Sequence, residues 1–317
     1  MDAEALTTFL AIHRQRGFSN AARFLHRTQP AISRRIALLE QELGVKLFER
    51  AAGGVALTQA GRTLLPHAER AVASLRDARD AIRALATGES GPLTMAIVGT
   101  LAGTDLTGLL RRFTHDYPAV ELILQTARSG EVSDLVRRAE ATIGLRYDRD
   151  PSGDLLSESL GSEPLLVACA PAHRLAGRTI ASLAALRDER WIAFPRTPQR
   201  PELPGSHIFS VFAARGMGEI DWMSIDSLTA QKRLVEAGFG VTLIPASSAE
   251  EELAAGTLAT IRVRDLDIGT PVFIVTRKGG YLSAAAHRLL ELLRARYAAG
   301  WRRRPPARYK RQKGRKR

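Results

Sequence analysis

The spacing of apolar residues changes once along this chain, and the change limits the folds that the chain can adopt. Up to about residue 87, apolar side chains recur every three or four residues, which is the period of an amphipathic α-helix. Beyond Pro92, short apolar runs alternate with helical patterns, as is typical of an open α/β sheet. The segment between them, 88–92, reads GESGP and is typical of a polar hinge. We therefore expect an α/β protein overall, with a mostly helical N-terminal part.

Composition narrows the class of protein further. No apolar run approaches the roughly 20 residues that a membrane helix needs, and the acidic start MDAE lacks a signal-peptide pattern. The single cysteine, Cys169, excludes an intrachain disulfide framework and fits a reducing cytoplasm. Because Cys169 lies in the apolar run Leu165–Ala170, we expect its thiol to be buried and unreactive. These features predict a cytoplasmic protein without membrane contact.

The net charge of +13 is concentrated at the C-terminus. Residues 302–317 hold ten lysines and arginines and no acidic residue, which leaves a net charge of +3 for the rest. Without apolar periodicity, the segment 301–317 is predicted to be a disordered basic tail. Such a tail either adds salt-sensitive attraction to phosphates or only solubilises the chain. The sequence leaves both interpretations open.

Three helices are predicted in the first 44 residues. Apolar spacing predicts a first helix that ends at Gly17, and Ser19 is the expected N-cap of a short second helix, Asn20 to Leu25. Thr28 is placed to cap a third helix with Pro30 in its first turn, where the missing proline N–H costs nothing. The third helix has one apolar face, formed by Ile32, Ile36, Leu39 and Leu43. Its opposite face carries Pro30, Arg34, Ala37 and Gln41, with Ser33 at the edge.

A capped helix with a polar outer face, preceded by a short helix and a turn, is the arrangement of a helix-turn-helix. The second helix of that motif enters the major groove, where its N-terminal residues meet base edges. Gln29 is suited to adenine and Arg34 to guanine, while Ser19, Thr28 and Ser33 are short donors for phosphates. Composition alone is equally consistent with a plain helical bundle that has a solvated polar face.

Five short sequence motifs between Phe18 and Gly61 distinguish between these interpretations: FSNAA, TQPAISRRI, LEQELG, LFER and LTQAG. In order and spacing they closely resemble the signature of LysR-type transcription regulators. The resemblance implies a winged helix-turn-helix over 1–58, with Leu47–Leu57 as the wing and Arg50 serving the DNA backbone or minor groove. The predicted DNA-binding residues are Ser19, Thr28, Gln29, Pro30, Ser33, Arg34, Arg35 and Arg50. The wing tip, 51–54, lacks the basic residue that family wings often carry, so weaker wing contacts are expected.

A long helix is predicted over 59–87, with Thr58 as its cap. A seam spaced by three and four residues is formed by Ala68, Ala71, Leu75, Ala78, Ile82 and Leu85. This heptad pattern is typical of a helix that pairs with a partner helix, although an amphipathic helix packed on its own chain would show it too. The family resemblance implies the former, a homodimer through this linker helix. The sequence leaves open whether the dimer or a tetramer is the final assembly.

The part of the chain after Pro92 is predicted to be a two-lobed α/β domain. Strand patterns occur at 93–98, 121–125, 141–145, 165–170, 192–194, 241–244 and 271–275, and helical patterns at 106–115, 131–138, 208–215, 228–237 and 282–296. The motifs EPLLV (163–167), LVEAGFGV (234–241) and LIP (243–245) resemble the LysR-type effector domain, which is similar to type 2 periplasmic binding proteins. The resemblance implies an effector-binding domain over 93–300. Lobe I is expected at 93–162 and 270–300, and lobe II at 163–269.

Ligands of open α/β sheets bind beyond the carboxyl ends of the strands. The first such point here is the glycine-containing loop 99–104, whose free N–H groups suit a carboxylate or another small anion. Thr126 and Arg146 follow the next two strands, while Arg196, Thr197 and Asp226 are placed to close the cleft from the second lobe. The predicted effector-binding residues are Thr100, Leu101, Ala102, Thr126, Arg146, Arg196, Thr197 and Asp226.

An enzyme and an architectural DNA binder are the two alternative functions. An enzyme is disfavoured because the sequence contains no Walker A, H-E-x-x-H or G-x-S-x-G motif, and one cysteine with scattered histidines makes a zinc site improbable. No catalytic residue, metal or cofactor is therefore predicted. An architectural DNA binder that relies on the basic tail would bind all sequences alike. The resemblance favours a regulator that binds double-stranded promoter DNA and a small-molecule effector, and it allows a contact with RNA polymerase.

Overall fold

The structure is a computed structural model that describes residues 1–51, 54–87, 91–195, 211–218, 220–298 and 301. Contacts divide the chain into two units. The first consists of Met1–Gly88 with two short segments, Arg137–Glu140 and Gly279–Tyr281, and the second holds the other described residues. Within the described part of the chain, none of the helices combines the length and the apolarity that a membrane crossing needs.

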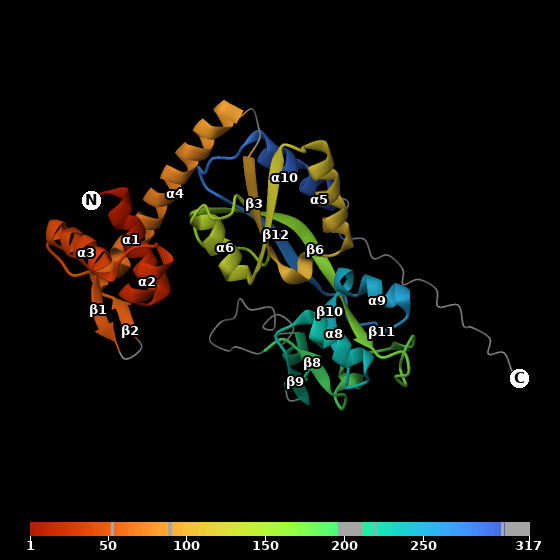
Figure 1. Cartoon of the computed structure of the whole chain (residues 1–317). Helices are drawn as coiled ribbons and strands as arrows, with labels where there is room; N and C mark the ends of the chain where they lie inside the picture. Colours follow the sequence, from red (N-terminus) through yellow and green to blue (C-terminus); the bar gives the residue numbers. More distant parts are fainter. Residues whose placement is uncertain (52–53, 88–90, 196–210, 219, 299–300, 302–317) are drawn as a thin grey trace, which may run out of the picture. The chain divides into compact units, whose positions relative to one another are not determined.

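The first unit consists of three short helices, a hairpin and a long helix (Figure 1). In chain order these are α1 (Ala3–Gln15), α2 (Phe18–Phe24), α3 (Gln29–Leu43), β1 (Phe48–Ala51), β2 (Gly54–Leu57) and α4 (Gln59–Thr87). They share one core, to which Phe9, Ile12 and Leu47 contribute fully buried side chains. Phe48 of the hairpin packs its ring against Phe9 at 5.3 Å and against Phe18 at 5.7 Å. The predicted helix-turn-helix with a wing is therefore confirmed.

The turn between α1 and α2 differs from the prediction. Arg16 adopts the left-handed conformation with φ of 53° and ends α1 one residue before Gly17. The N-cap of α2 is Gly17, so Ser19 lies inside the helix and its predicted role as N-cap is wrong. The reason is tertiary, because an early start of α2 places the Phe18 ring on the shared aromatic core.

The buried face of α3 is shorter than its apolar pattern. Ile32, Ile36 and Leu39 are buried as predicted, but Leu43 keeps 38% of its surface exposed. Glu40 is buried instead, and its carboxylate accepts hydrogen bonds from the backbone N–H of Leu47 and from Lys46. The core is thus closed at this end by the chain turning back toward β1, and Glu40 supplies the acceptor that the turn needs.

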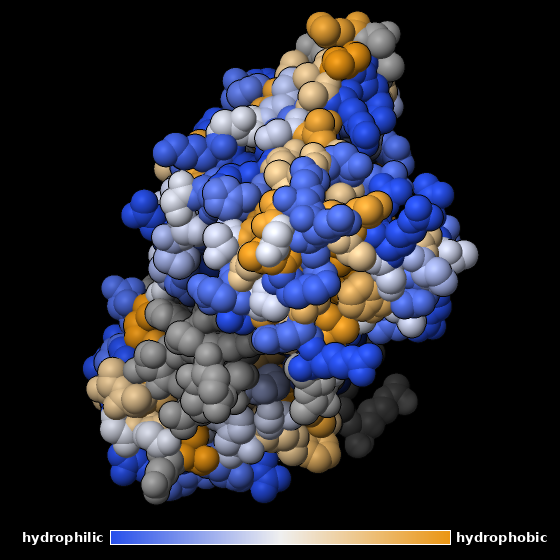
Figure 2. All heavy atoms as spheres, turned by 90° about the vertical axis from the view of Figure 1, so that its left-hand side faces the viewer, coloured by the Kyte–Doolittle hydropathy of each residue, from blue (hydrophilic) through white to orange (hydrophobic). Residues whose placement is uncertain are grey.

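The long helix α4 begins at the predicted cap, because the Thr58 hydroxyl accepts a hydrogen bond from the N–H of Gly61 at 3.1 Å. Its first half packs on its own unit, where Ala68 is fully buried and Leu64, Leu65 and Val72 pack against the same core. Its second half does not: Leu75, Ile82 and Leu85 are 44%, 68% and 88% exposed. Figure 2 shows hydrophobic residues at the top of the view, where α4 ends, beside strongly hydrophilic ones.

The second unit begins with a mixed sheet. Its path runs β4 (Val120–Ala127), β3 (Gly91–Val98), β5 (Ile143–Tyr147), β12 (Gly269–Arg277) and β6 (Leu155–Cys169). The first three strands are parallel, and β12 is antiparallel to both β5 and β6. Helices α5 (Thr104–Asp116) and α10 (Ala284–Tyr297) lie on one side of these strands and α6 (Ser129–Arg137) on the other (Figure 1). Together they enclose the first lobe's core.

The second lobe is built on the far end of β6. There β6 pairs with β10 (Thr242–Pro245) and β11 (Ala259–Val263), and β11 pairs with β7 (Thr179–Ile180). A separate pair, β8 (Trp191–Ala193) and β9 (Trp222–Ser224), and the helices α8 (Leu228–Glu236) and α9 (Glu250–Ala255) complete it. Cys169 at the end of β6 is buried, and burial raises the pKa of its thiol to about 12, as expected for an unreactive cysteine.

Two adjacent strands, β6 and β12, connect the two lobes. In β6 and β12, Pro164 pairs with Gly269 and Glu163 with Thr270, so the last strand returns to the first lobe as predicted. A Cβ on Gly269 would lie 2.7 Å from the Glu163 carbonyl oxygen, a backbone atom that cannot easily move aside, and 2.3 Å from the Ser162 hydroxyl. This crossing therefore requires glycine. The predicted strand at 165–170 covers only the second half of β6. The first half lacks an apolar run, because its few buried residues are separated by exposed, mostly polar ones.

Gly144 allows close packing of α6 on β5. A Cβ at this position would lie 2.5 Å from a methyl of Val275, 2.8 Å from Val132 and 3.0 Å from Val136. Valine side chains are stiff at χ1 and cannot easily move aside. We expect Gly144→Ala to lower the free energy of unfolding by about 1–3 kcal/mol, as measured by urea denaturation. Gly153→Ala, where a Cβ meets open space, is the matched control, and equal losses in the two variants would contradict the packing argument.

Candidate DNA-binding and effector-binding sites

The outer face of α3 is polar and open to solvent. Its N-cap is Thr28, which has extended backbone angles but makes no side-chain capping hydrogen bond, and Pro30 follows in the first turn. Gln29, Pro30 and Arg34 are exposed, and the Gln29 amide donates a hydrogen bond to the Ser33 hydroxyl at 2.8 Å. The buried residues Ile32 and Ile36 anchor the opposite face. The helix therefore presents an amide and a guanidinium outward, as a major-groove helix must.

The other predicted DNA-binding residues differ in their exposure and in their partners. Ser19 and Thr28 are exposed. Arg35 turns back toward α1, where its guanidinium lies 2.6 Å from the Glu4 carboxylate. Arg50 is exposed on β1 and pairs across the hairpin with Val55, within the wing predicted at Leu47–Leu57. Residues 52–53 of the wing tip lie outside the described residues.

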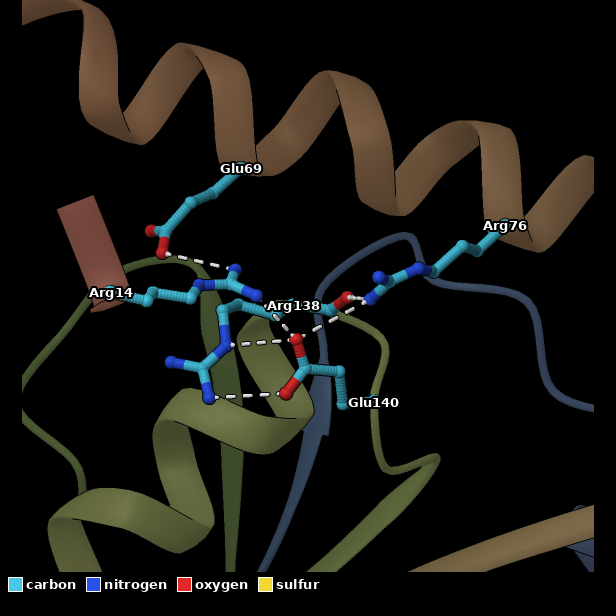
Figure 3. A network of polar contacts seen from close by, with 5 residues as sticks. All are labelled: Arg14, Glu69, Arg76, Arg138 and Glu140. Atoms are coloured by element: carbon cyan, nitrogen blue, oxygen red, sulfur yellow. Dashed lines mark hydrogen bonds and ion pairs between the residues drawn. The ribbon is translucent and has the colours of Figure 1, made fainter. Parts of the chain in front are cut away.

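A cluster of charges within the first unit joins α1 and α4 to the segment Arg137–Glu140 (Figure 3). The Glu140 carboxylate lies 2.7 Å from Arg14, 3.2 Å from Arg138 and 3.6 Å from Arg76. Burial by itself raises the pKa of Glu140, but the hydrogen bond and charge of Arg138 and the charges of Arg14 and Arg76 hold it below its usual value. Glu140 thus stays ionised among three guanidiniums. Sequence reasoning did not single out this cluster, because its members are far apart in the chain.

The loop after β3 holds the first predicted effector-binding residues. Thr100 and Leu101 lie in the short helix η1 (Gly99–Leu101) and are both buried. The Thr100 hydroxyl donates to the hydroxyl of Tyr147 at 3.0 Å, and its carbonyl accepts from Ser248 at 3.1 Å. The predicted residues Ala102, Thr126 and Asp226 are exposed. Arg196 and Thr197 lie outside the described residues.

The Arg146 side chain is buried and hydrogen-bonded inside the first lobe. Its guanidinium is 3% exposed and donates to Asp150 and to the Ser133 hydroxyl, both at 2.5 Å, and to the Tyr147 carbonyl at 3.1 Å. Burial alone raises the pKa of Asp150, but hydrogen bonds from Ser133 and Ser152 and the charge of Arg146 lower it below its usual value. Arg146 therefore holds α6, β5 and the following turn together.

Glu163 is a buried charged group that sequence reasoning missed as a site residue. It is fully buried at the lobe crossing and accepts hydrogen bonds from Tyr147 at 3.1 Å and from Ser247. The only available signal was a lone acidic residue that is separated by Pro164 from the apolar run Leu165–Ala170. In the described ranges, no group of three or more His, Cys, Asp or Glu side chains is placed to hold a metal ion.

Comparison with known proteins assigns the family. Residues 3–62 match the model of the bacterial regulatory helix-turn-helix proteins of the lysR family, and residues 86–298 match the LysR substrate binding domain. The chain belongs to the LysR family of transcriptional regulators. Both parts of the fold agree with this assignment: a helix-turn-helix with a wing, and a two-lobed α/β domain.

The relatives cover most of the chain. The transcriptional regulator IlvR of Caulobacter vibrioides is 32% identical over 93% of this chain and 97% of its own. TfdS of Cupriavidus pinatubonensis is 31% identical over 86% and 91%. Among solved structures, full-length CbnR complexed with its target DNA has a TM-score of 0.62 at 26% identity, with 93% of this chain and 100% of that chain covered.

The buried Arg146–Asp150 pair yields a stability prediction. Arg146→Met leaves the Asp150 carboxylate buried without its cation, so we expect the free energy of unfolding to fall by about 3–5 kcal/mol in urea denaturation. The double variant with Asp150→Asn recovers part of the loss, because the uncompensated charge is gone. Arg149→Met, at an exposed position, is the control and should change stability by less than about 0.5 kcal/mol. A loss no larger than that of the control would contradict a structural role for Arg146.

Proposed function

We propose that this regulator binds promoter DNA sequence-specifically through the outer face of α3. The observation that supports this most directly is the exposure of Gln29 and Arg34 on a helix whose other face is fixed in the core. Ser19, Thr28, Pro30, Ser33, Arg35 and Arg50 flank them as phosphate or minor-groove contacts. Arg35 must give up its ion pair with Glu4 to contribute.

Dimerisation follows from the second half of α4. The seam residues Ile82 and Leu85 are exposed in the single chain, and a second copy of the helix would remove them from water. Two copies of α3 on one DNA face would read two half-sites. The proposed assembly is a homodimer through α4 that associates into a tetramer, and contact with RNA polymerase would carry its effect to transcription.

The effector-binding site is proposed at the carboxyl ends of the parallel strands β3, β4 and β5. Thr100, Leu101, Ala102 and Thr126 lie at the ends of the first two strands, and Asp226 lies in the second lobe. Arg196 and Thr197 complete the proposed set and lie outside the described residues. A small anion suits this edge because α5 begins there with no side-chain cap on its N-terminal N–H groups. The role of Arg146 in this proposal is to fix the loop beyond β5, since its guanidinium already has partners inside the lobe.

The domain boundaries that fit this function are 1–58 for DNA binding, 59–87 for dimerisation, 88–92 for the hinge, 93–300 for the effector domain and 301–317 for the tail. The relatives are transcriptional regulators, and we propose a regulator without catalytic activity. Its place of action is the cytoplasm, where promoter DNA is accessible.

The DNA proposal predicts a loss of affinity without unfolding. Sites are first selected from a random DNA pool with the full-length chain. We expect Arg34→Ala or Gln29→Ala to weaken binding to the selected site by about 1–3 kcal/mol and to narrow the difference from scrambled DNA, because base contacts are lost. Gln41→Ala, exposed near the other end of α3, is the matched control and should bind like the parent chain.

Fluorescence anisotropy at fixed salt measures these affinities, and a chain lacking residues 302–317 is measured in parallel. Specific binding that survives the deletion supports the proposal. Equal affinity for all sequences, lost with the tail, would instead indicate an architectural DNA binder. Unchanged affinity of both α3 variants would refute the assignment of the recognition face.

The dimer proposal is tested on α4. Ile82→Glu places a charge on the exposed seam, so we expect the dimer dissociation constant to rise at least about tenfold in sedimentation equilibrium. Arg79→Ala, off the seam on the same helix, controls for general effects on the helix. A dimer as stable as that of the control would show that the chains associate elsewhere.

A further inference from the structure

A cavity of about 620 Å³ lies in the second unit, away from the proposed effector site. It is bounded by β6, β11, α9 and the C-terminal part of α10, and none of the predicted effector-binding residues lines it. Its volume is in the range of small-molecule sites, which are concave and mostly apolar with a few polar groups that orient the ligand. The cavity therefore has the size of a ligand site that the family assignment leaves unexplained.

The walls of the cavity are mostly apolar. Leu166 and Val167 of β6, Leu253 of α9 and Ile261 of β11 contribute aliphatic surface. Tyr297 and Trp301 contribute two stacked aromatic rings with centroids 4.5 Å apart. The Trp301 indole donates to the Leu160 carbonyl at 3.2 Å, which holds the ring in place. Such walls suit an aromatic or branched aliphatic body, and aromatic faces also attract organic cations.

The polar groups of the cavity favour a positively charged ligand. Its lining includes three carboxyls, from Asp105, Glu163 and Glu250, and two guanidiniums, from Arg262 and Arg296. Arg296 is already engaged by the Asp105 carboxylate. Glu163 is fully buried, and among the described residues it receives hydrogen bonds only from neutral groups, the Tyr147 and Ser247 side chains and the Ser247 N–H. A buried carboxylate without a counter-charge is costly, and an ammonium group would supply that charge.

We infer that this cavity is a second small-molecule site, which binds an apolar amine with its ammonium group at Glu163 and its body between the aliphatic wall and the Tyr297–Trp301 pair. The site stands independently of the proposed effector site. A chain of hydrogen bonds nevertheless leads from one to the other, because Tyr147 donates to Glu163 and accepts from Thr100 of the η1 loop. An amine bound at the Glu163 carboxylate would therefore alter this series of hydrogen bonds.

The test uses the full-length chain and three probes of similar size and different charge. These are 2-phenylethylamine, 3-phenylpropionate and 2-phenylethanol, and isothermal titration calorimetry at pH 8 measures their binding. We expect the amine to bind most tightly and Glu163→Gln to weaken it at least about tenfold, while leaving the alcohol little changed. Glu158→Gln, on the same strand but paired with Arg294 outside the cavity, is the matched control and should bind the amine normally.

The pH dependence gives a readout that a merely structural role would not produce. Burial raises the pKa of Glu163 to about 7, against hydrogen bonds from Ser247 and Tyr147 that lower it. The amine stays protonated between pH 6 and 8, whereas Glu163 loses its charge as the pH falls through its pKa. Amine affinity should therefore drop about tenfold from pH 8 to pH 6 in the parent chain and stay flat in Glu163→Gln.

The other titratable or charged groups that line the cavity or contact Glu163 come from several elements: Tyr147 of β5, Glu250 of α9, Arg296 and Tyr297 of α10, Asp105 of α5 and Arg262 of β11. Burial raises the pKa of both tyrosines, so both stay neutral over this range. All of these groups are shared by the parent chain and Glu163→Gln. The difference between the two pH profiles therefore reports Glu163 alone.

A second variant guards against misfolding of Glu163→Gln. Ala254 is exposed on α9 and lines the cavity, so Ala254→Trp fills the space without disturbing a buried residue and should abolish amine binding. The inference is overturned if the amine does not bind, if 3-phenylpropionate binds as tightly as the amine, or if amine affinity is the same in both variants as in the parent chain. DNA binding without amine is measured on the same samples, so failure of the cavity is distinguished from failure of the DNA proposal.

Discussion

The antiparallel pairing of β6 with β12 is the constraint on which the C-terminal domain depends. β6 is a single strand of fifteen residues that serves the sheets of both lobes, and β12 returns beside it. The two strands that connect the lobes lie next to each other, so the lobes are joined at one place, where Pro164 of β6 pairs with Gly269 of β12. A side chain at Gly269 would collide with the Glu163 carbonyl oxygen as well as the Ser162 hydroxyl, so the pairing tolerates no Cβ there. This geometry also buries the Glu163 carboxyl between elements of both lobes.

Arg34 in the first unit and Arg146 in the second have different roles, because the first side chain is exposed and the second is buried. Arg34 extends from a helix whose other face is apolar, and its guanidinium is free to meet a partner outside the chain. Arg146 lies among Asp150, Ser133 and a backbone carbonyl, where its donors are satisfied internally. A buried guanidinium with such partners stabilises one arrangement of the loop. An exposed one contributes little to stability and remains available for recognition.

Much of the fold could be predicted from the sequence because its signals are local. Thr58 at the start of α4, Pro30 in the first turn of α3 and the apolar residues Ile32 and Ile36 act within one or two helical turns. The strands β3, β4, β5 and β10 were recognisable as apolar runs. In contrast, the first half of β6 and the short strands β7, β9 and β11 lack such runs, since pairing with neighbours rather than composition makes them strands.

The sequence by itself determined the family, the order of the domains and the outward face of α3, because family motifs and helical periodicity depend on residues that are close together in the chain. Only the tertiary structure decided which polar groups are withdrawn from solvent. It buried Glu40 where Leu43 was expected, and it engaged Arg146 inside the first lobe. It also placed Glu163 at a cavity whose wall includes Tyr297 and Trp301, residues far along the chain from Glu163. Burial and pairing of charges are properties of three-dimensional packing, and no local pattern encodes them.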